Sequence, residues 1–329
     1  MNNVLIDLTY LVASVLFILG IRGLTHPRTA VRGNLFGAGG MLLAVVATLL
    51  DQQIFGAGPE AFAWILGGVV LGATIGATFA LKINLTAIPE MVALLNAFGG
   101  GASALVAGAV LVGETNPSTQ TAIATVASGI IGSVTFWGSL VAFDKLRGLL
   151  LPDRPVIFPA QQILNGVLGI TALGLGVMVV STPASTEFYV GVVVVASLLG
   201  VLLTIPIGGA DMPVAIALLN SYSGLAAAST GFVLSNNILI ITGSLVGASG
   251  IILTMIMCKA MNRSLINVLV GAIAESGGAR SDADEVYAGR VKTTSAEEVA
   301  MLLDGVRRVV IVPGYGLAVS QAQHQVRDL

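Results

Sequence analysis

Long apolar segments alternate with short polar stretches over most of the chain, and a polar tail follows them. A run of about 20 apolar residues in a helix is long enough to span the hydrocarbon core of a bilayer. Each segment is therefore predicted to be a membrane-spanning helix, and the fold is expected to be a polytopic α-helical membrane protein. Nine such helices are predicted, over residues 4–22, 33–50, 61–81, 89–112, 121–143, 161–181, 187–206, 213–234 and 238–258.

Composition leads to the same class of protein. Hydrophobic residues make up 55% of the sequence and charged residues 10%, and the mean hydropathy is +0.94. A chain of 329 residues cannot bury so much apolar surface inside one water-soluble core. The net charge of −2 averages an apolar part and a polar tail, so it gives no reason to expect nucleic-acid binding. The single cysteine, Cys258, excludes an internal disulfide and is expected to serve packing.

Charged residues between the expected helices are divided unequally between the two sides of the membrane. If successive helices alternate in direction, one side carries only the acidic residues Asp51, Glu60, Glu114 and Glu187 near its loops. The positive-inside rule places the other, basic side in the cytoplasm. The N-terminus is therefore expected outside and the tail inside. The basic side carries Arg22, Arg28, Arg32, Lys82, Lys145, Arg147, Arg154, Lys259 and Arg263.

The fourth and eighth predicted helices resemble each other. Residues 88–99 match residues 212–223 with a proline and an asparagine in register, Asn96 in one copy and Asn220 in the other. The helices that follow also correspond, because Lys145 takes the place of Lys259. Four helices separate the copies, so both copies cross the membrane in the same direction, and a parallel internal repeat is expected. Shared apolar composition is the alternative explanation, but the two aligned Pro-x₆-Asn units argue against it.

A few polar side chains lie in or beside the predicted helices, where each needs an explanation. Asn96 and Asn220 can hold helices together by hydrogen bonds or orient water on a proton path. Glu90 and Asp211 lie at helix starts, where capping is the default role, and Asp211 is also a candidate for gating or proton handling because it follows a glycine-rich break. Ser139 can bond its own helix backbone or line a polar path.

The tail begins with a Gly-, Ser- and Asp-rich linker. The segment Thr294-Ser295-Ala-Glu297-Glu298 then supplies a capping box for a short amphipathic helix through Leu303. A strand over Val309–Val312 is predicted to run into a Gly-x-Gly turn and a helix start, where backbone N–H groups can face a pyrophosphate. A plain strand–turn–helix unit is the alternative. The candidate cofactor-binding residues are Gly314, Tyr315, Gly316, Leu317, Ala318 and Val319.

Four segments together resemble one family: residues 208–213, 219–224, 257–264 and 313–323. On these segments the chain is similar to the beta subunit of proton-translocating nicotinamide nucleotide transhydrogenase. The resemblance implies a proton-conducting membrane domain over 1–263, a linker over 264–293, and over 294–329 the beginning of a Rossmann-like α/β domain that binds NADP(H). It further implies a partner alpha subunit that binds NAD(H), direct hydride transfer between the two nicotinamides, no metal, a dimer of alpha–beta units, and a bacterial inner membrane.

The resemblance also implies roles for individual residues. Residues 314–319 would approach the NADP(H) pyrophosphate, while Asp211, Asn220 and Ser139 match positions tied to proton translocation or its coupling. Several family members have a histidine where this chain has Asn96, and neither His26 nor His324 lies in a predicted membrane-spanning helix. This difference implies that a helix of a split alpha subunit supplies the group that titrates.

Two further expectations follow from the sequence. Because the sequence ends at Leu329, in the first helix of the nucleotide-binding domain, we expect a fragment that does not bind NADP(H) tightly by itself. The repeat and the proline-broken helices also fit a proton-coupled secondary transporter, which would take up a solute without nicotinamide nucleotides. A membrane scaffold without transport is the third possibility.

Overall fold

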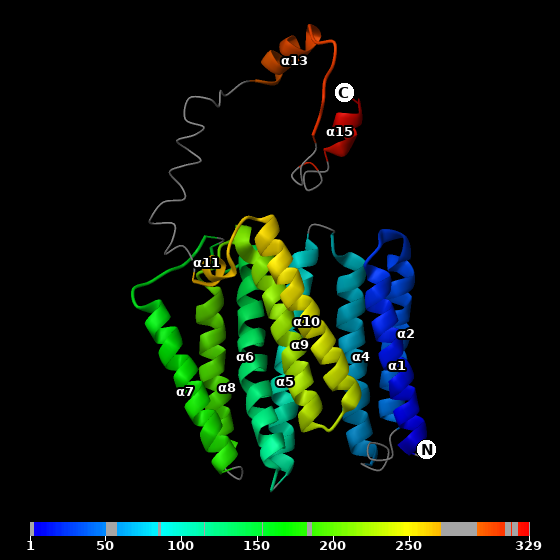
Figure 1. The fold of residues 1–329 in the computed structure, drawn as a ribbon, viewed down its shortest axis with the longest axis vertical. Coiled ribbons are helices and arrows are strands. Elements are labelled where there is room, and N and C mark those ends of the chain that lie inside the picture. The colour runs from blue at the N-terminus through cyan, green and yellow to red at the C-terminus, as the bar shows by residue number, and fades with distance from the viewer. Residues whose placement is uncertain are drawn as a thin grey trace. The chain divides into compact units, whose positions relative to one another are not determined.

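The computed structural model describes residues 3–50, 58–84, 87–114, 116–152, 154–182, 186–270, 295–312, 317 and 322–328 (Figure 1). The chain divides into two compact units, Met1–Gly271 and Ala272–Leu329. Each unit is described by itself.

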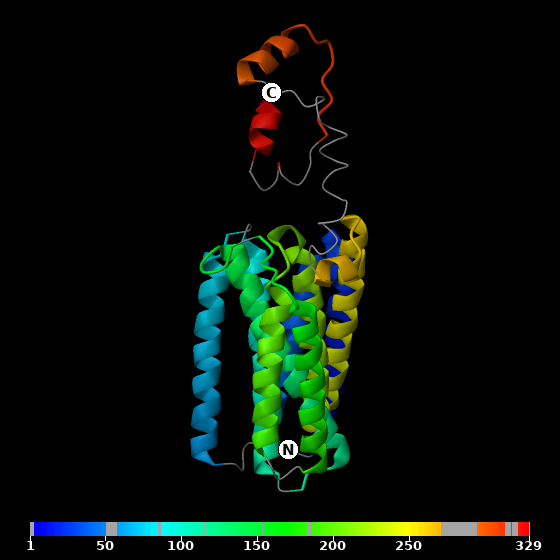
Figure 2. The ribbon, with the colours of Figure 1, turned by 90° about the vertical axis from the view of Figure 1, so that its left-hand side faces the viewer.

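Within the described residues, nine helices of the first unit are long and apolar enough to cross a membrane, which confirms the nine predicted spans. Figures 1 and 2 show them standing side by side. The helices are α1 (Asn3–Leu24), α2 (Pro27–Leu49), α4 (Pro59–Lys82), α5 (Ile88–Gly113), α6 (Thr119–Arg147), α7 (Gln161–Ser181), α8 (Thr186–Thr204), α9 (Met212–Val233) and α10 (Asn237–Ala260).

The observed helix ends differ most from the prediction at α2 and α6. Helix α2 begins at Pro27 rather than at residue 33, because proline has a backbone angle suited to the first turn of a helix. Helix α6 continues to Arg147 rather than ending at residue 143, and it stops at Gly148, whose φ of 64° closes the helix in the left-handed conformation. Lys145 therefore lies inside a helix instead of in a loop.

The centre of the first unit is formed by α6 and α9, which have the most buried residues of the nine helices. Small residues let the backbones approach closely there. A Cβ atom at Gly100 of α5 would lie 2.7 Å from the carbonyl oxygen of Gly132 of α6. A Cβ atom at Gly224 of α9 would collide with the backbone of α10 at Gly243 and Gly247. Close backbone contact is what holds helices together in lipid, where apolar surface alone does not drive association.

Basic residues gather at one end of the helix bundle, which we call the basic end. It is the end where α1, α4, α6, α8 and α10 finish and where α2, α5, α7 and α9 begin (Figure 1). The opposite end carries Glu60, Glu114 and Glu187, and Asp51 lies outside the described residues. The basic end carries Arg22, Arg28, Arg32, Lys82, Lys145, Arg147, Arg154, Lys259 and Arg263.

Helix α4 differs from the other long helices because none of its residues is buried. It stands at the edge of the bundle, in light blue in Figure 2. Gly68, Gly72 and Gly76 are spaced four residues apart along it, and a Cβ atom at any of the three would meet nothing within 4 Å. The small-residue face of α4 is therefore free of contacts with the described part of this chain.

The first residues of the expected linker are helical. Helix α11 (Leu265–Val270) follows α10, and its residue Val268 is buried in the same apolar cluster as Met212 and Ala215 of α9. The segment that leaves the membrane helices is thus attached to the start of α9 before it continues toward the second unit.

The described part of the second unit contains α13 (Ala296–Asp304) and α15 (Gln323–Asp328). The N-cap half of the predicted capping box is confirmed at α13, since the Ser295 hydroxyl accepts a hydrogen bond from the Glu298 N–H at 3.3 Å. The pKa of the Glu297 carboxyl is lowered, first by its own backbone N–H and then by the Ser295 hydroxyl.

The strand predicted over Val309–Val312 is not present, because these residues have neither helix nor strand structure. A strand forms only by pairing with another strand, and the described residues contain no second strand. The hydrophobic pattern that predicts the strand reflects the β-propensity of these four residues. A favourable propensity does not provide the second strand that a β-ladder requires.

We predict that Gly224→Ala destabilises the first unit. The added methyl group forces α9 away from α10, and overpacking of this kind costs about 1–3 kcal/mol. Thermal unfolding of the detergent-purified protein measures the effect as a lower midpoint. Gly169→Ala on α7 is the matched control, because a Cβ atom there meets nothing within 4 Å. Equal midpoints for the two variants would contradict close α9–α10 contact.

Candidate functional site

Two acid–arginine pairs lie at the basic end of the bundle. Glu90, in the first turn of α5, is 3.6 Å from the Nε of Arg147 at the end of α6. Asp211 forms the end of a short 3₁₀ helix, η2 (Gly209–Asp211), and lies 3.5 Å from an Nη1 atom of Arg263, just beyond the end of α10. Each pair connects the start of one long helix with the end of the next.

Asp211 has unequal surroundings for its two carboxylate oxygens. Oδ2 faces Arg263, whereas Oδ1 is buried and has no hydrogen-bond partner among the described residues. The loop sequence around Asp211 contains no basic residue, so its cationic partner comes from a different loop. Asn262 makes this possible, because its φ of 52° turns the chain and lets the Arg263 N–H donate to the carbonyl oxygen of Cys258 at 2.9 Å.

Asn96 is buried, and its amide links two helices. Its Nδ2 donates to the carbonyl oxygen of Ile216 on α9 at 3.4 Å. Ile216 lies one helical turn before Asn220 on α9. Asn96 on α5 therefore contacts α9 about one turn away from Asn220, the other asparagine of the expected repeat. Asn220 is half-buried, and its amide makes no hydrogen bond within the described part of the chain. The structure supports the helix-linking role for Asn96 and leaves the Asn220 amide available to another partner.

Ser139 is completely buried in α6, and its hydroxyl has no hydrogen-bond partner among the described residues. Of the two alternatives that the sequence leaves open for Ser139, the bond to its own helix backbone is therefore not made. Ser128, also buried in α6, contrasts with it. The Ser128 hydroxyl donates to the carbonyl oxygen of Ser103 on α5 at 3.0 Å and lies 2.7 Å from the hydroxyl of Thr230 on α9. These three residues join α5, α6 and α9, and the sequence analysis did not single them out.

Lys145 is buried, although the sequence predicts that it lies in a cytoplasmic loop. Only 1% of its surface is exposed. Its ammonium group donates to the carbonyl oxygens of Arg154 at 3.1 Å, Ile205 at 2.6 Å and Ile207 at 2.8 Å. The burial of Lys145 could have been predicted only from the length of α6. If that helix is extended past residue 143, Lys145 lies in the helix and can face the bundle.

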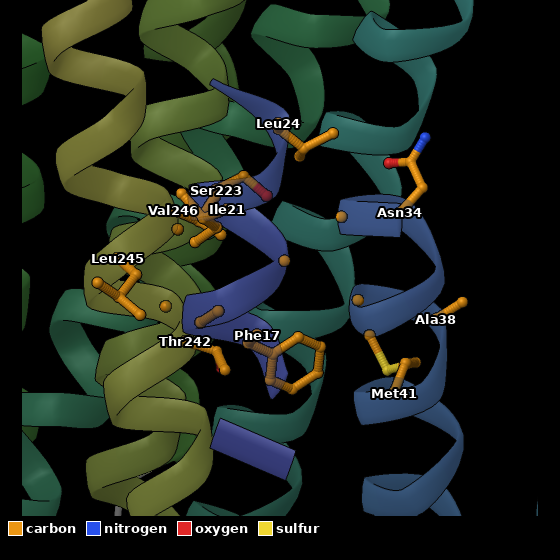
Figure 3. A pocket seen from close by; sticks show the side chains of 16 residues that line it. Phe17, Ile21, Leu24, Asn34, Ala38, Met41, Ser223, Thr242, Leu245 and Val246 are labelled. Carbon is orange, nitrogen blue, oxygen red and sulfur yellow. The ribbon is translucent and has the colours of Figure 1, made fainter. Parts of the chain in front are cut away.

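A groove of about 460 Å³ lies between the α1–α2 hairpin and the α9–α10 pair (Figure 3). Its walls are mostly apolar, with Phe17 and Ile21 on α1, Met41 on α2 and Val246 on α10. Thr242 is among its few polar residues. An apolar groove of this kind can take another hydrocarbon surface and offers no group for covalent chemistry.

The candidate residues fall into three places. Glu90 and Asp211 lie at the basic end in separate ion pairs, Asn96 and Asn220 lie close together along α5 and α9, and Ser139 is buried in α6. Among the described residues, no three His, Cys, Asp or Glu side chains are grouped so as to hold a metal ion. Of the six predicted cofactor-binding residues, only Leu317 is described, and Gly314, Tyr315, Gly316, Ala318 and Val319 lie outside the described residues.

Comparison with known proteins gives a consistent result over the whole chain. Residues 6–329 match the family model described as NAD(P) transhydrogenase beta subunit. A relative from Rhodospirillum rubrum, named NAD(P) transhydrogenase subunit beta, is 44% identical over 337 aligned residues. The alignment covers 100% of this chain and 71% of the relative. A second sequence, from a designated strain of the same species, gives the same values.

We predict opposite effects for the same substitution at two buried serines. Ser128→Ala removes hydrogen bonds between three helices and should lower the unfolding free energy by about 1 kcal/mol. Ser139→Ala removes a hydroxyl that has no partner, so stability should stay the same or rise. The thermal unfolding midpoints of the two variants and of the native protein, measured in detergent, test both expectations. A strongly destabilised Ser139→Ala would mean that its hydroxyl has a hydrogen-bond partner after all.

Proposed function

This chain belongs to the NAD(P) transhydrogenase beta subunit family, and from that premise we propose that its helices carry the proton path that is coupled to hydride transfer between NADH and NADP⁺. The chain is the membrane part of a proton-translocating transhydrogenase. The alpha subunit supplies the NAD(H) site, and the complete second unit of the beta subunit supplies the NADP(H) site. NADP(H) and NAD(H) act as substrates, and no metal takes part.

The proton path is proposed to run beside Asn96, Asn220 and Ser139. These are neutral polar groups, so they can orient water or a hydroxyl without carrying the proton themselves. The unpartnered hydroxyl of Ser139 and the unbonded amide of Asn220 support this role, because each can bond to a further group. We assign the titrating group to a membrane helix of a split alpha subunit.

Coupling is proposed to pass through the ion pair of Asp211 and Arg263, which is the observation that carries this part of the proposal. Arg263 lies where the chain leaves α10 for α11 and the second unit, while Asp211 lies at the start of α9. The pair therefore ties the segment that leads to the nucleotide domain to a membrane helix. A proton-dependent change in this contact would favour one of two arrangements of that segment, as coupling between sites requires. The pair of Glu90 with Arg147 is assigned a similar holding role at α5.

The parallel arrangement of the two acid–arginine pairs supports the internal repeat. In both copies an acid at the start of the first helix pairs with an arginine at or beyond the end of the second. We retain the division into a membrane domain over 1–263, a linker over 264–293 and the beginning of the NADP(H)-binding Rossmann-like domain over 294–329. Residues 314–319 are proposed to approach the pyrophosphate.

The basic end of the bundle is proposed to face the cytoplasm. Basic residues are retained on that side of a membrane, and the chain leaves the bundle toward the second unit from the same end. The N-terminus then lies outside a bacterial inner membrane, and two alpha–beta units form a dimer.

We assign the free face of α4 to a membrane helix of the alpha subunit. The name of the family implies an alpha partner. Gly68, Gly72 and Gly76 form a face of the type that lets two membrane helices touch, and no residue of α4 is buried in this chain. Elsewhere in the bundle comparable glycines, such as Gly224, are used in helix contacts.

The direct test of the function uses the subunit as its gene encodes it, produced together with the alpha subunit of the same source. In membrane vesicles we expect hydride transfer from NADH to an NADP⁺ analogue, with a rate that responds to the proton gradient. Solute uptake that needs no nicotinamide nucleotide would instead indicate a secondary transporter. Absence of both activities in vesicles that contain the assembled complex would indicate a scaffold.

We predict that Asp211→Asn lowers the rate of proton-coupled hydride transfer by about fivefold or more, the lower end of typical coupling strengths. The variant should remain folded in the membrane, because a partly exposed ion pair contributes only about 0–1 kcal/mol. Glu60→Gln is the matched control, since it removes an exposed carboxylate at the opposite end. Native coupled rates in Asp211→Asn would dismiss the role of the pair.

We also predict that Gly72→Leu weakens association with the alpha subunit while the chain itself stays folded. The leucine side chain fills the space that a partner backbone would occupy, and a Cβ atom at this position meets nothing within 4 Å in the described part of the chain. Co-purification with a tagged alpha subunit measures the loss. Gly169→Leu on α7 is the control, because its surroundings are equally open. Undiminished co-purification of Gly72→Leu would place the partner on another face.

A further inference from the structure

The ammonium group of Lys145 is buried and donates to backbone carbonyl oxygens of two connecting segments. An ammonium group has three N–H donors, and here each finds a carbonyl oxygen, on Arg154, Ile205 and Ile207. Burial of a cation is unfavourable unless such partners are present. The site therefore depends on all three acceptors being held in place at once, and Lys145 in turn holds the segments that carry them.

The acceptors belong to two connections at the basic end. Arg154 lies between α6 and α7, while Ile205 and Ile207 lie in the turn that follows α8. The end of a helix has carbonyl oxygens without helical partners and a partial negative charge, so a cation placed there is stabilising. Lys145 thus caps α8. The Ile205 oxygen also accepts from the Val156 N–H at 3.2 Å, which joins the two connections directly.

The turn that Lys145 holds leads to Asp211. Between Ile207 and Asp211 the chain passes through Gly208 and Gly209, which do little to fix the direction of the backbone. The position of Asp211 is therefore set by the anchors on either side of the glycines. One anchor is the bond from Lys145 to the Ile207 oxygen, and the other is Met212, which is completely buried at the start of α9.

We propose that Lys145 is a positioning residue: its ammonium group fixes the turn after α8 and so determines where Asp211 meets Arg263. The role of that pair in coupling rests on the proposed function, but the positioning itself does not. Lys145 corresponds in the repeat to Lys259, which is exposed. Only the first copy therefore has the buried lysine, and it serves the acid of the second copy.

The position of the turn can be tested without any activity, because Cys258 is the single cysteine of the chain and lies in one buried cluster with Ile207 and Met212. We expect N-ethylmaleimide to label Cys258 at least about tenfold faster in Lys145→Met, since loss of charge-assisted hydrogen bonds eases local opening. Lys145→Gln keeps two N–H donors and should label at an intermediate rate. Lys82→Met, an exposed lysine at the same end, should label at the native rate.

If Lys145→Met does not fold, Lys145→Gln decides the result. Native labelling rates in the folded Lys145 variants would overturn the proposal, and so would equally fast labelling in Lys82→Met.

A double-mutant cycle in the assembled complex then separates positioning from general stability. Lys145→Gln should lower the coupled rate of hydride transfer in the native background and add little in the Asp211→Asn background, because the group it positions is already altered. Additive losses would overturn action through Asp211. If the native complex shows no coupled hydride transfer, the proposed function fails, while the labelling of Cys258 still decides whether Lys145 holds the turn.

Discussion

Close contact between helix backbones is the constraint on which the rest of this molecule depends. Lipid is as apolar as leucine, so bulky apolar side chains give membrane helices little reason to associate. Here α6 and α9 meet through small residues, and α5 and α10 approach them at glycines such as Gly100 and Gly224. The hydroxyls of Ser128 and Thr230 then bond across helices that are already near. The polar groups buried in this centre are mainly serine and threonine hydroxyls, which are small enough to fit between closely packed backbones.

Charged side chains lie at the two ends of the bundle, and at the basic end they connect helix ends and loops. Glu90 and Asp211 each face an arginine, and Lys145 caps the end of α8. The middle of the bundle holds only amides and hydroxyls, such as Asn96 and Ser139. This division separates two tasks. In the proposed mechanism, the amides and hydroxyls in the middle orient water without becoming charged. The loops at the basic end can then change their arrangement while the packing of the helices stays the same.

Local patterns in the sequence predicted the nine long helices and the Ser295 cap, because each depends on residues close together in the chain. Contacts between distant segments were not predictable in the same way. Arg263 reaches Asp211 only after the chain has crossed the membrane twice, and burial of Lys145 follows from where α8 ends. The strand predicted over Val309–Val312 shows the opposite error, since the residues that the structure describes include no strand with which it could pair.

The open face of α4 has a consequence for how the cell makes this subunit. Helix α4 buries none of its residues against the described part of its own chain. If the alpha subunit covers this face, as proposed above, a beta subunit made in excess would present an uncovered helix to the proteases of the membrane. Balanced synthesis of the two subunits would then be needed to keep the exposed surface of α4 covered.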